Sequence, residues 1–219
     1  MSKIVPIKPF LIVFYGYPGS GRTYFARQFC DEIQAAHLQS DKIRAQLFET
    51  PRYDTQENAI TKQLMDYMAE EFLSVGVSVV YDADIYTNAQ RLALKNLALK
   101  FGAELLVIWL QVDVETSFLR NIKRDKRKID DKFSTKWDRS TFDRVTKRMQ
   151  NPNPSKELIV ISGKHLFQTQ RNAVLSALKN RSIINKSDNL TKVAKPGMVN
   201  LVPANQGRVD MSRRNIFIR

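Results

Sequence analysis

The stretch FLIVFYGYPGSGRT, residues 10–23, decides the fold class expected for this chain of 219 residues. Residues 10–15 form an apolar run typical of a buried strand, and a helix is predicted to begin near Gly21. Between them, Gly16, Gly21 and Thr23 fit the phosphate-binding pattern G-x-x-x-x-G-K-[ST]. Such a turn presents backbone N–H groups and a helix N-terminus to a phosphate. The stretch predicts a phosphate-binding loop, the alternative being a glycine-rich turn that binds nothing.

The lysine position of this pattern holds Arg22. Arginine keeps the positive charge, but on a planar fork instead of a compact ammonium, so the loop predicts phosphate binding more strongly than fast phosphoryl transfer. Thr23 can offer its hydroxyl to Mg²⁺, and we expect ATP and Mg²⁺ as cofactors. The residues expected to contact the nucleotide here are Gly16, Pro18, Gly19, Ser20, Gly21, Arg22, Thr23 and Tyr24.

Apolar runs alternate with apolar residues at helical spacing along most of the chain. Strands are predicted at 11–15, 36–39, 77–81, 105–110 and 158–161. Helices are predicted at 21–35, 56–74, 114–127, 138–150 and 167–180. A further helix is expected to begin at Asp41, with Ile43 and Leu47 facing inward, and another to end at Gly102. This alternation predicts an α/β fold of three layers, α/β/α, around a five-stranded parallel sheet. With the glycine-rich loop after its first strand, this arrangement resembles the P-loop NTPase fold. We expect one domain over residues 1–181 and a basic, mostly irregular tail over 182–219.

The net charge of +13 is unevenly distributed. Residues 1–119 carry a net −3, whereas residues 120–148 carry 12 Lys and Arg against 5 Asp and Glu, a net +7. The tail after residue 180 carries 8 against 2, a net +6. Such patches attract polyanions, which include nucleotides, nucleic acids and acidic membrane surfaces. The alternatives are a solvated basic helix at 120–148 and, for the tail, solubility with non-specific binding.

Composition excludes several classes of site. The single cysteine, Cys30, allows no internal disulfide, and His37 and His165 add too few ligands for a Cys/His zinc site. No apolar run approaches the ~18 residues of a membrane span, and the first residues lack the apolar core of a signal peptide. We expect a soluble, cytoplasmic protein without membrane contact. The oligomeric state does not follow from the sequence.

Charged residues follow the second and third predicted strands, where parallel strands present ligand sites. Asp41 and Arg44 follow the second strand, and Asp82 and Asp84 follow the third. Asp82 could hold Mg²⁺ directly or through water, Asp41 could orient or deprotonate an acceptor, and Arg44 could grip an acceptor-side phosphate. The alternative for Asp41 is a helix N-cap, and for Asp82 or Asp84 an ordinary loop carboxylate.

Together these motifs resemble a known family. The strand with G-x-x-G-S-G-[KR]-[ST], the S-D-x-x-R of residues 40–44, the Asp after strand three and a basic lid at 120–148 are similar to small P-loop kinases. This is the AAA-type group of predicted kinases, which includes the 5′-kinase domain of polynucleotide kinases and the zeta-toxin-like kinases. The resemblance covers roughly residues 10–180 and excludes the tail.

The resemblance implies roles for individual residues. Asp41 corresponds to the general base that acts on a 5′-hydroxyl, and Arg44 to the arginine that contacts the acceptor phosphate. The family's lid brings arginines over the nucleotide, and Arg120, Arg124 and Arg127 occupy that region. We therefore expect Asp41, Arg22 and Arg124 to be catalytic, Arg120 and Arg124 to bind nucleotide, and Thr23 with Asp82 to hold the metal.

The predicted function is transfer of the γ-phosphoryl of ATP to a hydroxyl of a nucleic-acid end or a nucleotide-like acceptor. The basic lid and the tail favour single-stranded nucleic acid as a partner, and Phe133 and Trp137 could stack on a base. One alternative is a nucleotide-regulated nucleic-acid-binding protein with a degenerate, arginine-containing loop. The other is a kinase of a small metabolite whose basic segments serve solubility.

Overall fold

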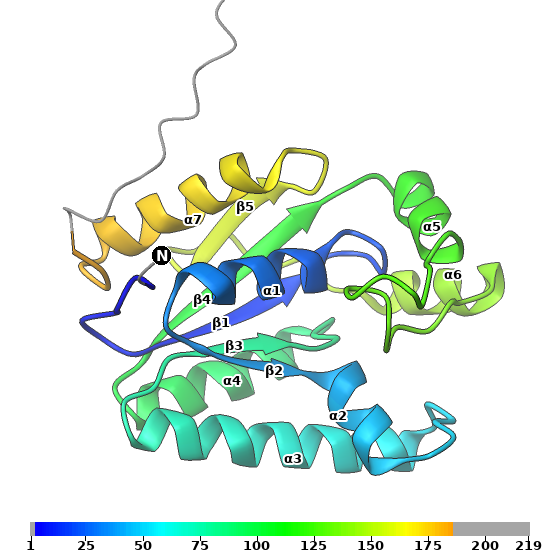
Figure 1. The fold of residues 1–219 in the computed structure, drawn as a ribbon, viewed down its shortest axis with the longest axis horizontal. Helices are drawn as coiled ribbons and strands as arrows, with labels where there is room; N and C mark the ends of the chain where they lie inside the picture. The colour runs from blue at the N-terminus through cyan, green and yellow to red at the C-terminus, as the bar shows by residue number, and fades with distance from the viewer. Residues whose placement is uncertain (1–2, 186–219) are drawn as a thin grey trace, which may run out of the picture.

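The apolar run at residues 10–15 forms the central strand of a five-stranded parallel sheet (Figure 1). The structure is a computed structural model that describes residues 3–185. The sheet order is β2-β3-β1-β4-β5, with every pair parallel. Its strands are β1 (Phe10–Tyr15), β2 (Ala36–Gln39), β3 (Val79–Asp82), β4 (Glu104–Gln111) and β5 (Leu158–Ser162). The helices are α1 (Arg22–Glu32), α2 (Ser40–Leu47), α3 (Thr55–Ser74), α4 (Asn88–Lys100), α5 (Val114–Ile122), α6 (Arg139–Arg148) and α7 (Phe167–Asn180).

Helices cover both faces of the sheet, because β1 is apolar at every position. Phe10, Ile12 and Phe14 belong to the core cluster that contains α1 and α7. Leu11 and Val13 belong to the opposite cluster, which contains α3 and α4. Helices α5 and α6 lie beyond the carboxyl ends of the strands (Figure 1). The three-layer α/β/α architecture and the five-stranded parallel sheet predicted from the sequence are therefore confirmed.

Helix starts follow local capping chemistry. Asp54, Asp113 and Asp138 each accept a hydrogen bond from a backbone N–H one turn on, at α3, α5 and α6. Helix α2 differs, because its N-cap is Gln39, which makes no side-chain capping bond. Asp41 lies inside the first turn of α2, so the interpretation of Asp41 as the N-cap is wrong, and its carboxylate is not used by the helix.

The inward faces of two helices differ from the sequence expectation. Leu47, expected to face inward, is 42% exposed, because α2 ends there and the chain turns away from the sheet. On α3 the apolar residues Ile60, Leu64, Met68 and Phe72 recur every four residues, but the buried residues stand one position later, at Thr61, Met65, Ala69 and Leu73. The spacing predicted the helix correctly, but apolar residues next to the buried positions made a neighbouring side of the helix look like the buried one.

The largest difference concerns the basic lid. The helix predicted at 114–127 ends at Ile122, and residues 123–138, which we call the lid loop, contain turns but no helix. The stretch Asp125–Lys128 offers no apolar side chain to bury, so a helix there would have no apolar face to pack against the protein. The lid is therefore α5, the lid loop and α6, and only its ends are helical.

The predicted boundary at residue 181 lies close to the end of the described chain. Ile183 and Ile184 are buried in the core cluster of α1 and α7, and the backbone N–H of Ile7 donates to the carbonyl of Ile183. Residues 186–219 of the predicted tail lie outside the described residues. Among residues 3–185, no helix has both the length and the apolar character needed to cross a bilayer.

The helix behind the phosphate loop is anchored by aromatic packing, which a core substitution can test. The ring of Phe25 lies 5.4 Å from Phe29, 5.7 Å from Phe167 and 6.1 Å from Phe14. Replacing Phe25 with Ala removes this packing, and we expect the free energy of unfolding to fall by about 3–5 kcal/mol. The matched control is Leu99→Ala on α4, where the side chain is 63% exposed and the loss should stay below about 0.5 kcal/mol. Urea unfolding measures both, and equal losses would contradict the packing described here.

Candidate functional site

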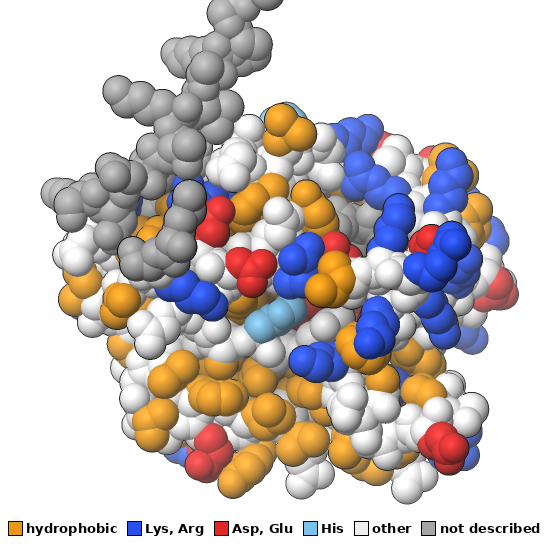
Figure 2. Space-filling view, in the orientation of Figure 1, with side chains coloured by type: hydrophobic (Ala, Val, Ile, Leu, Met, Phe, Trp, Pro, Cys, Tyr) orange, Lys and Arg blue, Asp and Glu red, His pale blue; other side chains and the backbone are white. Residues whose placement is uncertain are grey.

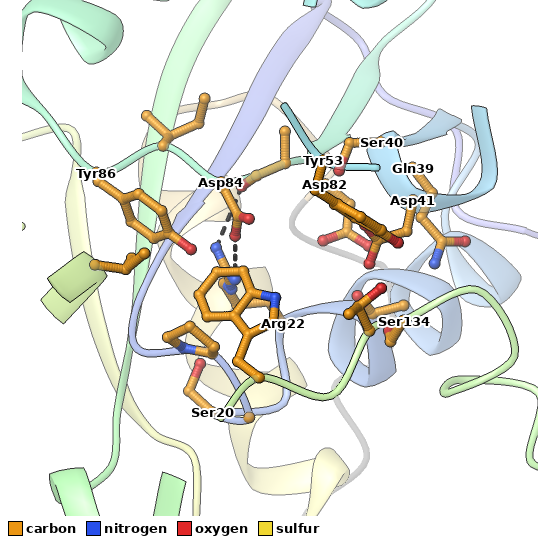
Figure 3. A pocket seen from close by; sticks show the side chains of 18 of the residues that line it. Ser20, Arg22, Gln39, Ser40, Asp41, Tyr53, Asp82, Asp84, Tyr86 and Ser134 are labelled. Carbon is orange, nitrogen blue, oxygen red and sulfur yellow. Dashed lines mark hydrogen bonds and ion pairs between the residues drawn. The ribbon is translucent and has the colours of Figure 1, made fainter. Parts of the chain in front are cut away.

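The carboxyl ends of β1, β2 and β3 open on a cleft of about 1260 Å³. Its walls come from the phosphate loop, α2, the start of α3, the loop after β3 and the lid (Figure 3). Of the residues assigned from the sequence to catalysis or to nucleotide, acceptor or metal binding, Gly16 alone does not line the cleft. Those that do are Pro18, Gly19, Ser20, Gly21, Arg22, Thr23, Tyr24, Asp41, Arg44, Asp82, Arg120 and Arg124.

The phosphate loop needs glycine where its backbone turns and where α5 approaches. Gly21, the N-cap of α1, has φ +100°, a left-handed conformation that L side chains rarely adopt. A Cβ on Gly19, which has φ +91°, would lie 2.3 Å from the carbonyl oxygen of Ser117 on α5. Helix α1 has no side-chain cap and no acidic residue in its first turn. Its positive end is therefore open to an anion in the cleft.

Arg22 crosses the cleft from α1 to the loop after β3. Its Nη2 lies 2.6 Å from Oδ1 of Asp84, and its Nη1 donates to the carbonyl oxygen of Ala83 at 3.3 Å. The guanidinium also stands 5.9 Å from the centre of the Tyr86 ring (Figure 3). The arginine that occupies the lysine position is therefore bound by a carboxylate of the loop after β3, across the cleft from the phosphate loop.

This pairing determines the charge state of both partners. Loss of hydration in the cleft lowers the pKa of Arg22, but the charges of Asp84 and its neighbours raise it more, so the guanidinium stays protonated. The same loss of hydration raises the pKa of Asp84, but the charge of Arg22, the hydrogen bonds from Tyr86 and Arg22 and the charge of Arg124 together hold that pKa below its usual value. Asp84 is therefore ionised at neutral pH and neutralises Arg22.

Asp41 lies in the same cleft with a very different charge state. Burial, together with the nearby carboxylates of Asp84 and Asp82, raises the pKa of its carboxyl to about 7. The cations Arg124 and Arg22 act in the opposite direction and do not cancel the shift. A carboxyl with a pKa near 7 and no capping duty is suited to exchange a proton at neutral pH.

Thr23 and Asp82 are the residues that could hold a divalent cation. Asp82 ends β3 with its side chain 6% exposed, and Nε2 of His37 on the neighbouring strand lies 3.4 Å from its Oδ2. Thr23 is the second residue of α1 and lines the same cleft. A hydroxyl and a carboxylate are donors that Mg²⁺ accepts, together with water and substrate phosphates. No group of three or more His, Cys, Asp or Glu within residues 3–185 is arranged to hold a metal by itself.

Arg44 is engaged more fully than the sequence suggested. Its Nη2 donates to Oδ1 of Asn58 at 2.6 Å, its Nη1 lies 3.4 Å from Glu57, and its guanidinium stacks 4.6 Å from the ring centre of Tyr53. The buried Nε of Arg44 has no partner among the described residues. The arginine joins α2 to the start of α3 and presents one unused donor in the wall of the cleft.

The lid supplies cations to one side of the cleft. Nη1 of Arg120 donates to the carbonyl of Gly163 at 2.9 Å, and Nη1 of Arg124 donates to the carbonyl of Thr135. Arg127 does not line this cleft and pairs with Asp125. The lid residues with positive charge that do line it are Arg120, Lys123, Arg124, Lys128, Arg144 and Arg148.

Of the two aromatic residues expected to stack on a base, Trp137 lines the cleft and Phe133 does not. The sequence analysis missed Tyr53 and Tyr86, which both line it. It noted Asp84 but did not assign it to the site. Asp84 could have been found from its place two residues after Asp82 in one loop. Tyr53, which has φ +60°, stands in a loop without any motif.

A family model described as an AAA domain (AAA_33) matches residues 11–152, more than half of the chain. No protein among the curated sequences matches this one. A solved structure of a putative kinase from Chloroflexus aurantiacus superposes with a TM-score of 0.64 at 15% identity, covering 78% of this chain and 99% of that chain. The APS kinase CysC of Mycobacterium tuberculosis, in complex with AMPPNP and APS, gives a TM-score of 0.58 at 17% identity. This match covers 78% of this chain and 98% of that chain.

The Pnkp1/Rnl/Hen1 RNA repair complex also superposes, with a TM-score of 0.53 at 20% identity over 64% of this chain and 44% of that chain. At such identities the likeness concerns the fold. The family match includes the phosphate loop, the start of α2, the loop after β3 and the lid, which are the segments that carry the resemblance seen in the sequence. The chain therefore belongs to this AAA domain family.

Proposed function

We propose that this protein transfers the γ-phosphoryl of ATP to a hydroxyl group of a nucleic-acid end or a nucleotide-like acceptor. The observation that carries the proposal is the convergence, in one cleft, of the phosphate loop with Asp41, Asp82 and the lid cations. Phosphoryl transfer needs a phosphate cradle, metal ligands, a carboxylate for the acceptor and cations for the developing charge. The cleft contains each of these.

In this mechanism Asp41 acts on the acceptor. Its ionised carboxylate accepts the proton of the acceptor hydroxyl while that oxygen bonds to the γ-phosphorus and the bond to the β-phosphate oxygen breaks, which releases ADP. Because the pKa of Asp41 is about 7, the ionised fraction and hence the rate should rise as the pH increases through that value. Arg22 and Arg124 offset negative charge on the transferred group and on the oxygen that leaves.

Mg²⁺ fits the donor set of the cleft. Thr23 would hold the ion through its hydroxyl, and Asp82 through its carboxylate or a water molecule. When bound, the ion would neutralise phosphate charge. Because we assign two ligands to it among residues 3–185, we expect metal affinity to depend on the nucleotide.

The lining of the cleft supports an anionic, aromatic acceptor. Arg144 and Arg148 of α6 face it together with Trp137 and Tyr53, and base stacking with phosphate contacts is typical of single-strand recognition. The structural likeness to an RNA repair complex agrees with this choice, whereas the likeness to APS kinase favours the small-metabolite alternative. For the location we propose the cytoplasm, since the free Cys30 is buried and suits a reducing compartment.

A second candidate function rests on the pairing of Arg22. Because Asp84 and the Ala83 carbonyl hold the guanidinium, the loop could bind nucleotide without efficient transfer. The protein would then be a nucleotide-regulated nucleic-acid-binding protein. Transfer of labelled phosphate from ATP to 5′-hydroxyl oligonucleotides separates the two, since the second candidate binds both ligands without forming a phosphorylated product.

The role of Asp41 gives a direct test of the proposed function. In Asp41→Asn the base is lost, and we expect turnover to fall by about 10²- to 10⁴-fold with little change in the affinity for Mg·ATP. Asp31→Asn is the matched control, because Asp31 is an exposed residue of α1 outside the cleft. Steady-state assays give the turnover, and calorimetry gives the affinity. Unchanged turnover in Asp41→Asn would remove the base from the mechanism.

The raised pKa of Asp41 also predicts a dependence of stability on pH. An aspartate in the unfolded chain has a pKa near 3.9. Between about pH 4 and pH 7 the folded protein therefore keeps a proton on Asp41 that the unfolded chain has lost, and the free energy of unfolding falls as the pH rises. Asp41→Asn lacks this term. The free energy of unfolding of Asp41→Asn should therefore increase relative to that of wild type by up to about 1.4 kcal/mol for each pH unit in that window. Above the window this difference should level off.

Urea unfolding of wild type and Asp41→Asn at several pH values measures this difference. Asp31→Asn again serves as the control and should follow the wild-type curve. Parallel curves for wild type and Asp41→Asn would show that the carboxyl of Asp41 has an ordinary pKa in the folded protein.

A further inference from the structure

A second, smaller cavity of about 540 Å³ lies on the lid. Its lining comes from both ends of the lid loop: Arg124, Asp125, Lys126, Arg127, Thr135 and Lys136. Arg124 and Thr135 also line the main cleft, so the two cavities share a wall. An elongated ligand bound in the cleft would reach this second cavity at the point where the ligand extends out of the cleft.

The charge of the second cavity is strongly positive. Its only acidic residue, Asp125, is held by Arg127, whose Nη2 lies 2.8 Å from Oδ2. The hydrogen bond from Arg127, together with the charges of Lys128 and Lys136, lowers the pKa of Asp125. Lys126 and Lys136 have no carboxylate partner among residues 3–185. Two of the four cations are therefore uncompensated, beside an arginine shared with the cleft.

The surface around the cavity has the same character. In Figure 2 the Lys and Arg side chains gather over the side of the molecule where Figure 1 places α5, α6 and the lid loop. Residues 120–148 carry a net +7, whereas residues 1–119 carry a net −3. A small metabolite confined to the cleft would not touch Lys126 or Lys136, so solubility or a longer polyanion has to account for them.

We propose that the second cavity is a subsite for the backbone phosphates of a single-stranded nucleic acid whose 5′-hydroxyl end lies in the cleft. This inference rests on the proposed function and names its acceptor class, because it makes the acceptor a strand with several phosphates instead of a nucleoside monophosphate. Arg124 marks the passage from the reacting end to the following phosphates. Lys126 and Lys136 contact those phosphates as point charges, without reading the sequence.

The test compares two double variants of the full-length chain that remove the same charge. The first variant, Lys126→Ala with Lys136→Ala, removes the two uncompensated lysine side chains from the second cavity. Lys132→Ala with Lys147→Ala is the matched control, since both are exposed lid lysines that line neither cavity. Fluorescence anisotropy with a 5′-hydroxyl oligonucleotide labelled at its 3′ end measures affinity as a function of salt, independently of turnover.

If both lysines contact phosphates, the slope of log K against log salt should become shallower by about 1.4 in the cavity variant. This corresponds to a loss of roughly 25-fold in affinity at 0.1 M monovalent salt, while the control should change far less. The KM for the oligonucleotide should rise to a similar extent. The KM for a nucleoside 3′-monophosphate, which ends inside the cleft, and the affinity for Mg·ATP should stay the same.

Equal losses in both double variants would overturn the proposal, because general charge would then explain binding. Unchanged oligonucleotide affinity in the cavity variant would also overturn it. A selective loss of affinity in a protein that transfers no phosphate would support the subsite for a strand and reject the phosphotransferase function, so the two claims can fail separately.

Discussion

The ion pair between Arg22 and Asp84 is the interaction on which the charge balance of the cleft depends. Asp41, Asp82 and Asp84 share one cleft, and the carboxylates of Asp82 and Asp84 both raise the pKa of Asp41. Arg22 is the cation paired directly with one of them, at 2.6 Å. A nucleotide that draws Arg22 toward its phosphates would leave Asp84 without its partner. In this account phosphates and Asp84 compete for the same guanidinium, so the arginine at the lysine position makes nucleotide binding and the charge state of the cleft interdependent.

The architecture explains why these groups meet. Parallel strands bring their carboxyl ends to one edge, so the phosphate loop, the start of α2 and the loop after β3 converge although they are far apart in the sequence. Helix α5 packs against the phosphate loop so closely that Gly19 has no room for a Cβ. The lid is therefore anchored to the loop at one end, while the lid loop itself contains no helix. Packing against α5 fixes the position of the phosphate loop, whereas the lid lines the cleft with long, charged side chains.

The fold could be predicted because its signals are local and repeated. The apolar strands and the glycine spacing of residues 16–21 have few other structural explanations. The lid was predicted less well, because helical spacing at 114–127 cannot show that residues 125–128 lack anything to bury. Placement in the cleft could be predicted for Asp41, Asp82 and Arg44 from motifs. The pairing of Arg22 with Asp84, the raised pKa of Asp41 and the stacking of Arg44 on Tyr53 depend on contacts between distant segments, which no pattern in the sequence encodes.

The central claim is that the loop at residues 16–23 binds the phosphates of a nucleotide and that Arg22 leaves Asp84 to do so. Calorimetric titration of the full chain with a non-hydrolysable ATP analogue and Mg²⁺ tests it most directly. The account predicts one binding site, weaker binding in Arg22→Ala, and tighter binding in Asp84→Asn, where the competing charge is gone. Absence of binding to the wild-type protein at millimolar nucleotide, or affinities that do not respond to either substitution, would contradict it.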